Sequence, residues 1–312
     1  MSASVDVVIT TYQGWDLTKR CLEQLERQTI AHVVLVSDGA STDGTSENVR
    51  RQFPHVKLLT SAVDPGYAAA TNRGVAAGRG DVVVLLNNDA FCRPDFLEQI
   101  VAPFAADPEV GAVAPLALRP DEQTIDSVGL TLDVTLAPFI RLTGMPHHRC
   151  EAARPLLASP GGGADAYRRA AWLDAGGFDE RLVFYGADID LGLRLRARGW
   201  TIVAAPKAVV VHVRSATSGH RSRRARESGG WARAYILRRW GILHSRAAVR
   251  ALATEILVVA AELLVSRDGV SVRSRIRGWR AAGGLPRRSV PTGAVDRQIG
   301  FLESLRLRWG AR

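Results

Sequence analysis

The chain has 312 residues and a mass of 33.7 kDa, enough to form one large domain with an appendage or two modest domains. Its three cysteines, Cys21, Cys92 and Cys150, are too few and too scattered for a disulfide framework or a cysteine-based zinc site. A strand pattern follows the first four residues directly, without the charged and apolar regions of a signal peptide. We therefore expect a cytoplasmic protein.

The net charge of +10 is distributed unevenly along the chain. Residues 1–212 carry 20 basic and 25 acidic side chains, whereas residues 213–312 carry 21 arginines and 6 acidic side chains. Such a basic region favours an anionic partner, either a nucleic acid or a membrane surface. The signatures of the common nucleic-acid-binding folds are missing from the sequence. We therefore expect no nucleic-acid partner and a peripheral association of the basic region with the membrane.

Residues 247–266 are mostly apolar but include Arg250, Glu255 and Glu262. Charged side chains are costly inside a bilayer, so this pattern argues against a spanning helix. It favours a helix that lies against the bilayer or packs on the main domain.

Strand and helix patterns alternate through the first 90 residues. Apolar runs at residues 5–12, 32–38, 56–61 and 81–89 predict buried strands. The segments between them predict helices at 16–28, after the capping residues Asp43 and Thr45, and at 67–78. This alternation predicts an α/β fold, with a doubly wound, mostly parallel sheet and helices on both faces. Ligands of such folds bind beyond the carboxyl ends of the strands.

Polar side chains follow three of these strands at the point where each strand ends. They are Thr10, Thr11 and Tyr12 after the first strand, Ser37 and Asp38 after the second, and Asn87, Asn88 and Asp89 after the fourth. A single polar end fits an ordinary turn. Three such ends at one edge of a sheet indicate a binding site.

Beyond residue 111 the pattern becomes irregular, with short strands and a long loop-rich stretch to residue 158. A glycine-rich turn and a helix follow, then an amphipathic helix at about 189–198 and strand-like runs at 201–213. We expect one domain over 1–215, in which the pattern changes at about residue 115. An Arg-rich helical extension would then cover 216–312.

Five motifs occur in order along the chain: VVITTYQGWDLTKRCLEQL, VSDGASTDGT, ATNRGVAAGRGDVVVLLNNDA, GGFDERLVFYGADIDLGLRLRARGW and VVVH. Together they resemble the family 2 glycosyltransferases with a GT-A fold, in particular the bacterial rhamnosyltransferase-like members. The resemblance covers residues 5–215 and implies a GT-A domain over 1–215, with a donor half at about 1–115 and an acceptor half at about 116–215. It implies an inverting enzyme that moves a sugar, with rhamnose favoured, from a dTDP- or UDP-sugar to a hydroxyl. The acceptor would be a glycan or a polyprenyl-diphosphate-linked intermediate of cell-wall or surface polysaccharide synthesis.

The resemblance implies that the donor lies at the ends of the first two strands. Asp38 would accept the N3–H of the pyrimidine, with Thr10 and Tyr12 lining the same pocket. Asn72, on the helix before the fourth strand, matches a family position near the donor. Uracil and thymine present the same N3–H edge, so the base of the donor stays open.

The segment Asn87-Asn88-Asp89 matches the DxD element of the family. Negative charge grows on the leaving diphosphate as the glycosidic bond breaks, and a divalent cation, Mg²⁺ or Mn²⁺, offsets it. These cations prefer oxygen ligands, so Asp89 is the expected metal ligand, and the resemblance implies that His212 completes the site. Asn87 stands where many members have Asp. We expect Asn87 to contact the ribose or a metal-bound water, with Asn88 also on the donor side.

An inverting transferase needs a base that deprotonates the acceptor hydroxyl during the attack. Asp188 matches the family's base, although Ala187 stands where Glu is usual beside it. Asp190 is the competing carboxylate and is assigned to acceptor binding. Gly162 and Gly163 would let the backbone come close to the acceptor sugar.

Structural roles compete with several of these assignments. Asp38 could form an Asx turn, Asp188 could cap the helix that follows it, and His212 could be an ordinary structural histidine. At the level of function, one alternative is a nucleotidyltransferase, although the glycine-rich phosphate loop of that class is missing near the N-terminus. The other is a non-catalytic nucleotide-sugar or nucleic-acid binding protein on a decayed transferase fold, which Asn87 and Ala187 favour.

Overall fold

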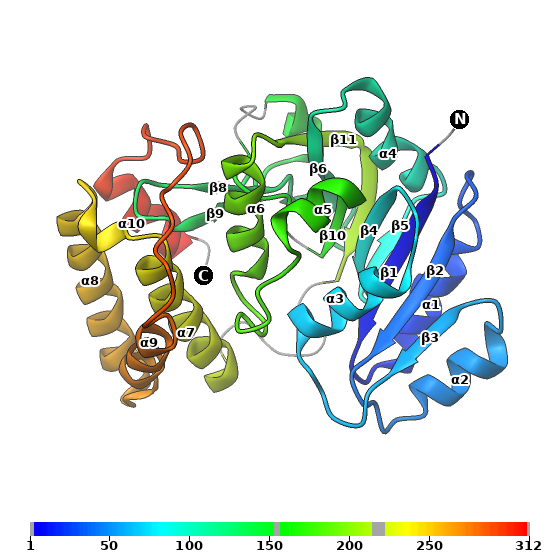
Figure 1. Cartoon of the computed structure of the whole chain (residues 1–312), viewed down its shortest axis with the longest axis horizontal. Coiled ribbons are helices and arrows are strands. Elements are labelled where there is room, and N and C mark those ends of the chain that lie inside the picture. Colours follow the sequence, from blue (N-terminus) through cyan, green and yellow to red (C-terminus); the bar gives the residue numbers. More distant parts are fainter. Residues whose placement is uncertain (1–2, 153–156, 162, 214–221, 311–312) are drawn as a thin grey trace. The chain divides into compact units, whose positions relative to one another are not determined.

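A computed structural model describes residues 3–152, 157–161, 163–213 and 222–310 (Figure 1). The chain divides into two compact units. Unit 1 comprises Met1–Leu130 and Ile140–Thr217, and unit 2 comprises Thr131–Phe139 and Ser218–Arg312. Gly162, which the sequence assigns to acceptor binding, lies outside the described residues.

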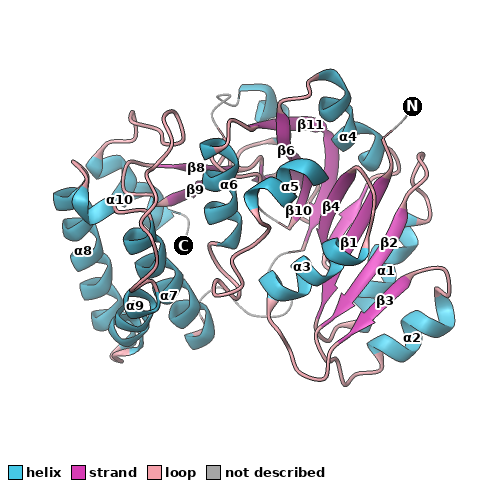
Figure 2. Ribbon diagram, in the orientation of Figure 1, coloured by secondary structure: helices cyan, strands magenta, loops and turns pink. Residues whose placement is uncertain are grey.

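Unit 1 is built on a nine-stranded mixed sheet in the order β3-β2-β1-β4-β10-β6-β11-β5, with β7 paired to β6 (Figure 2). Its strands are β1 (Val5–Thr11), β2 (Val33–Asp38), β3 (Lys57–Thr60), β4 (Val82–Asn87), β5 (Ala90–Cys92), β6 (Val110–Leu118), β7 (Ile125–Ser127), β10 (Ala164–Arg168) and β11 (Thr201–His212). The first four strands along the order are parallel, as the alternating pattern predicts.

The second half of the sheet is not parallel throughout. β10 runs antiparallel to both β4 and β6, while β11 is parallel to β6 and antiparallel to β5. The backbone N–H of Asn87, at the end of β4, donates to the carbonyl oxygen of Gly163, at 2.8 Å. β10 therefore starts at the edge where β4 ends and must run back along it. The prediction of an α/β sheet is confirmed, with this antiparallel insertion as the difference.

Helices cover both faces of this sheet (Figure 2). They are α1 (Trp15–Leu25), α2 (Thr45–Gln52), α3 (Tyr67–Ala77), α4 (Phe96–Ala106), α5 (Arg169–Ala175) and α6 (Ala187–Ala197), with a 3-10 helix at His147–Ala152. Val7 and Ile9 of β1 belong to one core cluster with Leu22 of α1 and Ile100 of α4. Side chains alternate along a strand, so Val8 points to the opposite face, where α3 packs on β1.

Unit 2 is helical. It contains α7 (Arg223–Arg239), a 3-10 helix at Ile242–His244, α8 (Ala248–Ser266), α9 (Val270–Ala281) and α10 (Phe301–Gly310). β8 (Leu130–Leu132) and β9 (Pro138–Ile140) form a separate two-stranded sheet, and most of this hairpin belongs to unit 2. None of the helices in the described part of the chain combines the length and hydropathy that a bilayer-spanning segment needs.

Buried Asp133 holds the hairpin to the helices of unit 2. Its carboxylate accepts hydrogen bonds from Arg250 of α8 at 3.0 Å and from the hydroxyl of Ser304 of α10 at 2.8 Å. It also accepts the hydroxyl of Thr135 and the backbone N–H of Ala137 within the hairpin itself. A buried carboxylate needs partners of this kind, which explains why the hairpin belongs to the helical unit.

Candidate functional site

The carboxyl ends of β1, β2 and β4 lie next to one another. Thr11 is the Cα partner of Asp38, and Thr10 is the Cα partner of Asn87, because the three strands are parallel neighbours in register. Tyr12 follows β1 directly and is 41% exposed, so its ring is available to a ligand. The structure thus brings together the predicted residues at these strand ends.

Asp38 is 1% exposed and stabilises the turn that follows β2. One carboxylate oxygen accepts hydrogen bonds from the backbone N–H of Ser41 at 3.1 Å and from its hydroxyl at 2.5 Å. The other oxygen accepts the hydroxyl of Ser46. These contacts match the structural alternative considered for Asp38. A carboxylate offers about four acceptor positions, so capacity for one further N–H is left.

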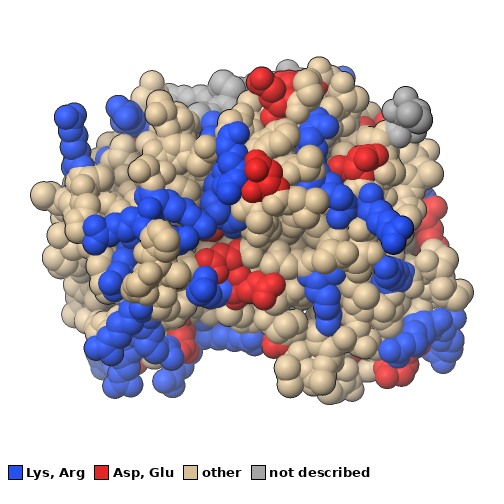
Figure 3. Space-filling view, in the orientation of Figure 1, with Lys and Arg blue, Asp and Glu red and all other residues tan. Residues whose placement is uncertain are grey.

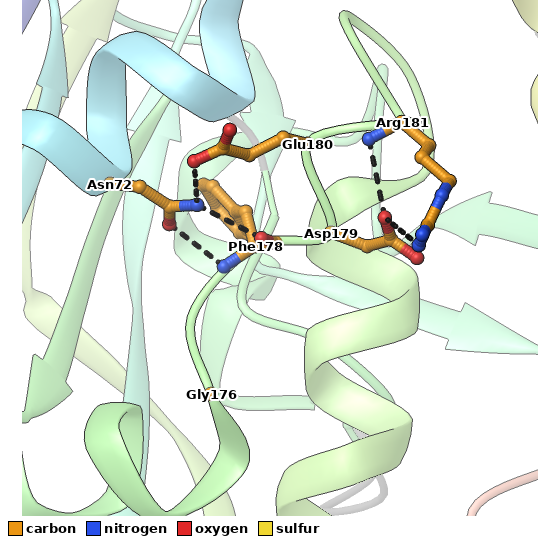
Figure 4. Close-up of a pocket in the computed structure, with 6 residues that line it drawn as sticks. All are labelled: Asn72, Gly176, Phe178, Asp179, Glu180 and Arg181. Atoms are coloured by element: carbon orange, nitrogen blue, oxygen red, sulfur yellow. Dashed lines mark hydrogen bonds and ion pairs between the residues drawn. The ribbon is translucent and has the colours of Figure 1, made fainter.

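The side chain of Asn72, on α3, forms hydrogen bonds with the loop that precedes α6 (Figure 4). Its side-chain amide donates to the carbonyl oxygen of Phe178 at 2.9 Å and to Glu180 at 3.0 Å, and its oxygen accepts the N–H of Phe178 at 2.9 Å. These bonds fix the loop, which lines a pocket of about 580 Å³ together with Asn72. The structure therefore gives Asn72 a loop-holding role, and donor contact by its side chain stays a prediction.

Two predicted metal ligands, Asp89 and His212, lie close together. The Nε2 atom of His212, at the end of β11, is 3.3 Å from a carboxylate oxygen of Asp89, which follows β4. The backbone N–H of Val213 donates to the carbonyl oxygen of Asp89 and holds the two segments together. Both side chains are mostly buried, with His212 9% and Asp89 6% exposed.

The Nδ1 atom of His212 contacts Asp126 of β7 at 3.0 Å. Burial lowers the pKa of His212, but the hydrogen bonds to Asp126 and Asp89 outweigh it and raise the pKa to about 9. At that pKa both ring nitrogens carry a proton at neutral pH, so Nδ1–H donates to Asp126 and Nε2–H faces Asp89. A metal at Asp89 would take the place of the Nε2 proton. Metal-binding histidines typically have a carboxylate behind them in this way, because it fixes the tautomer and the ring orientation.

A divalent cation fits this arrangement. Asp89 supplies a carboxylate oxygen and His212 an imidazole nitrogen, and both are ligands that Mn²⁺ accepts. Among the described residues no group of three or more His, Cys, Asp or Glu side chains could hold a metal alone. The chain therefore offers two ligands, which suits a cation that is also held by substrate phosphates and waters.

The half-buried Asn87 side chain reaches the same place from β4. A Cβ atom added to Gly163 would come within 2.9 Å of both the Asn87 amide nitrogen and the Nε2 atom of His212. Gly163 also has a φ of 92°, a conformation that favours glycine. Glycine is therefore required here so that the backbone can pass beside these two side chains.

Asn88 points elsewhere. Its amide nitrogen donates to the hydroxyls of Thr11 at 3.1 Å and Thr18 at 3.2 Å, and the residue is 8% exposed. It thus ties the end of β4 to β1 and α1. The structure gives the Asn88 side chain this structural role, and donor contact by it stays a prediction.

Asp188, the predicted base, lies in the first turn of α6 and is half-buried. A Cβ atom added to Gly161 would come within 2.8 Å of its carboxylate. Burial raises the pKa of Asp188, and hydrogen bonds from backbone N–H groups at the helix start oppose the rise. A raised pKa brings this carboxyl group closer to the range in which a general base works at neutral pH.

The backbone at Gly161 therefore passes close to Asp188, and the backbone at Gly163 passes close to Asn87 and His212. The two glycines are separated by one residue along the chain. Asp188 and the predicted metal ligands consequently belong to one site, at the carboxyl ends of the strands.

Asp190 does not join this site. Its side chain is fully buried and accepts a hydrogen bond from Nε of Arg194 at 2.7 Å, as an ion pair one turn along α6. Arg194 in turn donates to the carbonyl oxygen of Ala175. The structure gives Asp190 the role of anchoring α6 to α5, which corrects its assignment to acceptor binding.

Two buried carboxylates at the site are not anticipated from the sequence. Asp126 lies behind His212. Asp165 of β10 lies near Asp188, and burial, with a smaller contribution from Asp188, raises the pKa of Asp165 to about 8. Asp126 and Asp165 are 1% and 3% exposed. Each interrupts a short strand with a charged residue, and this was the available signal, because a buried charge is costly without a purpose.

Comparisons with known proteins agree with the motifs. The chain matches the model of Glycosyl transferase family 2 over residues 6–153 and that of Glycosyl transferase family group 2 over residues 82–272. It is 31% identical over 242 residues to the N-acetylglucosaminyl-diphospho-decaprenol L-rhamnosyltransferase of Mycobacterium tuberculosis. This match covers 70% of this chain and 79% of that protein. It is also 31% identical over 225 residues to the O-antigen biosynthesis protein RfbC of Myxococcus xanthus, over 68% of this chain and 17% of that protein.

Solved structures show the same fold. The mannosyltransferase PcManGT from Pyrobaculum calidifontis, in complex with GDP-Man and Mn²⁺, superposes with a TM-score of 0.57 at 21% identity, over 98% of this chain and 85% of that chain. GalNAc-T7 with UDP, GalNAc and Mn²⁺ superposes with a TM-score of 0.56 at 15% identity, over 80% and 53%. The GT-A fold expected from the sequence is confirmed.

Proposed function

The chain belongs to the family 2 glycosyltransferases, and we propose that it transfers rhamnose from dTDP-rhamnose, or a related sugar from a dTDP- or UDP-sugar, to a lipid-linked glycan. The relative from Mycobacterium tuberculosis supports this substrate class, because its name specifies an L-rhamnosyl transfer to a diphospho-decaprenol acceptor. The reaction would belong to cell-wall or surface polysaccharide synthesis at the inner face of the membrane. The Arg-rich region after residue 212 supports that location, because it favours an anionic surface.

We assign the donor to the edge formed by β1, β2 and β4. The pyrimidine would lie between Tyr12 and the remaining acceptor positions of Asp38, with Thr10 beside it. The diphosphate would then extend towards Asn87 and Asp89 at the end of β4. This orientation follows from the register of the three strands, which sets the base site and the predicted metal ligands next to each other.

Asp89 and His212 would hold Mn²⁺ or Mg²⁺ at the diphosphate. When bound, such a cation offsets the negative charge that develops on the leaving nucleoside diphosphate. Asp126 fixes the His212 ring so that Nε2 faces Asp89. Asn87, whose amide lies at the same glycine, would bind the ribose or a metal-bound water.

Asp188 would act as the base. It would accept the proton of the acceptor hydroxyl while the hydroxyl oxygen attacks the anomeric carbon from the side opposite the diphosphate, which inverts the configuration. The observation that supports this assignment is the pair of glycines Gly161 and Gly163, because added Cβ atoms there would clash with Asp188 and with Asn87 and His212, respectively. Both groups that the reaction needs therefore flank one short backbone segment.

The test uses the full chain with Mn²⁺ and a panel of nucleotide sugars that includes dTDP-rhamnose and common UDP-sugars. We expect one donor to raise the thermal midpoint in a metal-dependent manner and to release its nucleoside diphosphate slowly. Asp89→Ala should lose both effects, whereas Glu122→Gln, an exposed control, should keep them. The proposal fails if no nucleotide sugar stabilises the wild-type chain.

A further inference from the structure

Helix α8 of unit 2 has its polar side inward. Glu255 accepts hydrogen bonds from Arg233 at 2.7 Å and from Arg275 at 3.1 Å, and Glu262 accepts one from Arg275 at 3.3 Å. Arg250 reaches buried Asp133 at 3.0 Å. Every charged side chain of α8 thus contacts another element of unit 2.

The opposite side of α8 is apolar and exposed. Seven large apolar side chains of α8 are exposed, among them Val265 (81%) near its C-terminal end. The other six, here called the α8 apolar face, are Val249 (81% exposed), Leu252 (49%), Ile256 (67%), Leu257 (48%), Leu263 (38%) and Leu264 (79%). Their spacing of three, four and seven residues places them on one side of an α-helix. A helix at the surface of a protein in water normally has the reverse arrangement, with apolar residues inward. The face is therefore suited to an apolar medium.

Further apolar side chains lie beside the start of α8. Arg250 donates to the carbonyl oxygen of Gly300 at 3.1 Å, which places the first turn of α10 next to it. Phe301 and Leu302 in that turn are 37% and 77% exposed. The exposed apolar surface thus continues from α8 towards α10.

Exposed arginines lie at both ends of α8 and on the neighbouring helix α9. Arg246 and Arg267 are exposed at the two ends of α8, and α9 exposes Arg273, Arg277 and Arg280. Figure 3 shows basic side chains gathered over α9 and the lower end of α8. A helix with an apolar face and arginines at its margins is the arrangement that lies in the interface of an anionic bilayer.

We propose that the α8 apolar face inserts into the outer part of an anionic lipid bilayer and that the arginines around it bind the lipid headgroups. The strongly basic charge of residues 213–312, with 21 arginines and 6 acidic residues, disfavours a second copy of the same surface as the occupant, because two such surfaces repel each other. The same charge favours anionic lipid. This inference rests on the proposed function in one respect, since a lipid-linked acceptor is reached at such a surface.

Vesicle co-sedimentation of the full chain tests the proposal. The vesicles are phosphatidylcholine with or without phosphatidylglycerol, and the mixture contains no nucleotide sugar, so the outcome does not depend on transferase activity. The test variant is Leu252→Gln/Ile256→Gln/Leu264→Gln. The matched control in unit 1 is Val33→Gln/Val63→Gln/Leu173→Gln, whose side chains are 53%, 74% and 65% exposed. Circular dichroism and thermal midpoints check that both variants fold.

We expect the wild-type chain to bind the anionic vesicles and to bind neutral ones much less. The α8 variant should bind anionic vesicles at least about tenfold more weakly, because three apolar side chains that would be buried in the bilayer are replaced by polar ones. The control should bind as the wild type does. Equal binding by the wild type and the α8 variant would overturn the proposal, as would the absence of binding of the wild-type chain to anionic vesicles. Light scattering that shows a wild-type dimer, dissociated by the α8 substitutions, would instead assign the face to a second copy.

Discussion

Asp165 and Asp188 place two carboxyl groups in one poorly solvated part of the site. Burial, with a smaller contribution from Asp188, raises the pKa of Asp165 to about 8, so Asp165 carries a proton at neutral pH. A protonated neighbour leaves Asp188, the proposed base, free to ionise. The two groups thus divide the tasks of staying neutral and of accepting a proton.

This pair predicts a pH dependence of stability. The folded chain binds a proton at Asp165 that the unfolded chain loses near its ordinary pKa of 3.8, so the free energy of unfolding falls as pH rises from about 4 to about 8. Asn cannot ionise, so Asp165→Asn should remove this part of the decline. Urea unfolding at intervals of about one pH unit between pH 5 and pH 9 measures how the free energy of unfolding depends on pH. Parallel curves for the two proteins would contradict the assignment.

Asp126 predicts an effect on metal binding without touching the metal. In Asp126→Asn the Nδ1 atom of His212 loses its carboxylate partner, which is 3.0 Å away in the wild type. We expect the affinity for Mn²⁺ in the presence of a nucleoside diphosphate to fall about 10- to 100-fold, as typically follows the loss of such a partner. Isothermal titration measures it, with the exposed substitution Glu122→Gln as control. An unchanged affinity would show that Asp126 only fills space.

At the scale of elements, the glycine turn before β10 sets the geometry of the site. Gly163→Ala would place a Cβ atom within 2.9 Å of Asn87 and His212 in addition to straining a φ of 92°. Gly199→Ala at the end of α6 has a similar φ of 89° but meets nothing within 4 Å, so it reports the backbone strain alone.

We therefore expect both glycine variants to lose about 1–2 kcal/mol of stability from strain, and only Gly163→Ala to lose donor and metal binding as well. Unfolding by urea and titration with Mn²⁺ and the donor separate the two effects. Retained binding in Gly163→Ala would mean that the turn does not shape the site.

The elements also show what the sequence could predict. The parallel strands β1, β2 and β4 were predictable because each is a mostly buried apolar run that ends in polar residues, whereas β3 is an exposed to half-buried strand. β10 was not, because its reversed direction depends on pairing with strands that are distant in sequence. Motif position predicts Asp89, Asp188 and His212 as site residues, but it does not specify where a side chain points.

Side-chain direction explains the assignments that the structure changes. Asn88 and Asp190 are adjacent to site residues along the chain, yet Asn88 turns to two buried threonines and Asp190 to an arginine one helical turn away. Asp126 lies 86 residues before its partner His212, so no local pattern could connect them. Contacts of this kind arise only from the fold.

At the scale of the whole molecule, unit 2 has an ionic centre in place of a purely apolar core. Burial raises the pKa of Glu255, but Arg233 and Arg275 outweigh it and lower the pKa to about 2. The acidic group is then ionised in the folded unit and stabilises it above its ordinary pKa of 4.5. This contribution is lost as pH falls towards 2, because the unfolded chain takes up the proton first.

Glu255→Gln should therefore destabilise unit 2 at neutral pH, by about 3 kcal/mol, and flatten its acid unfolding between pH 4.5 and pH 2. Helical circular dichroism followed against pH measures both. Glu303→Gln is a suitable control, because Glu303 is exposed on α10. An acid midpoint that is the same in Glu255→Gln and in the wild type would contradict the role of this network.

The central claim is that one site, with Asp188 as base and Asp89 and His212 as metal ligands, transfers a sugar to a lipid-linked acceptor. The most direct measurement is mass spectrometry of a polyprenyl-diphosphate-linked N-acetylglucosamine acceptor after incubation with dTDP-rhamnose, Mn²⁺ and the full chain. We predict that the wild type adds one sugar and that Asp188→Asn slows this about 10²- to 10⁴-fold while it still binds the donor. Transfer by Asp188→Asn at the wild-type rate would contradict the account.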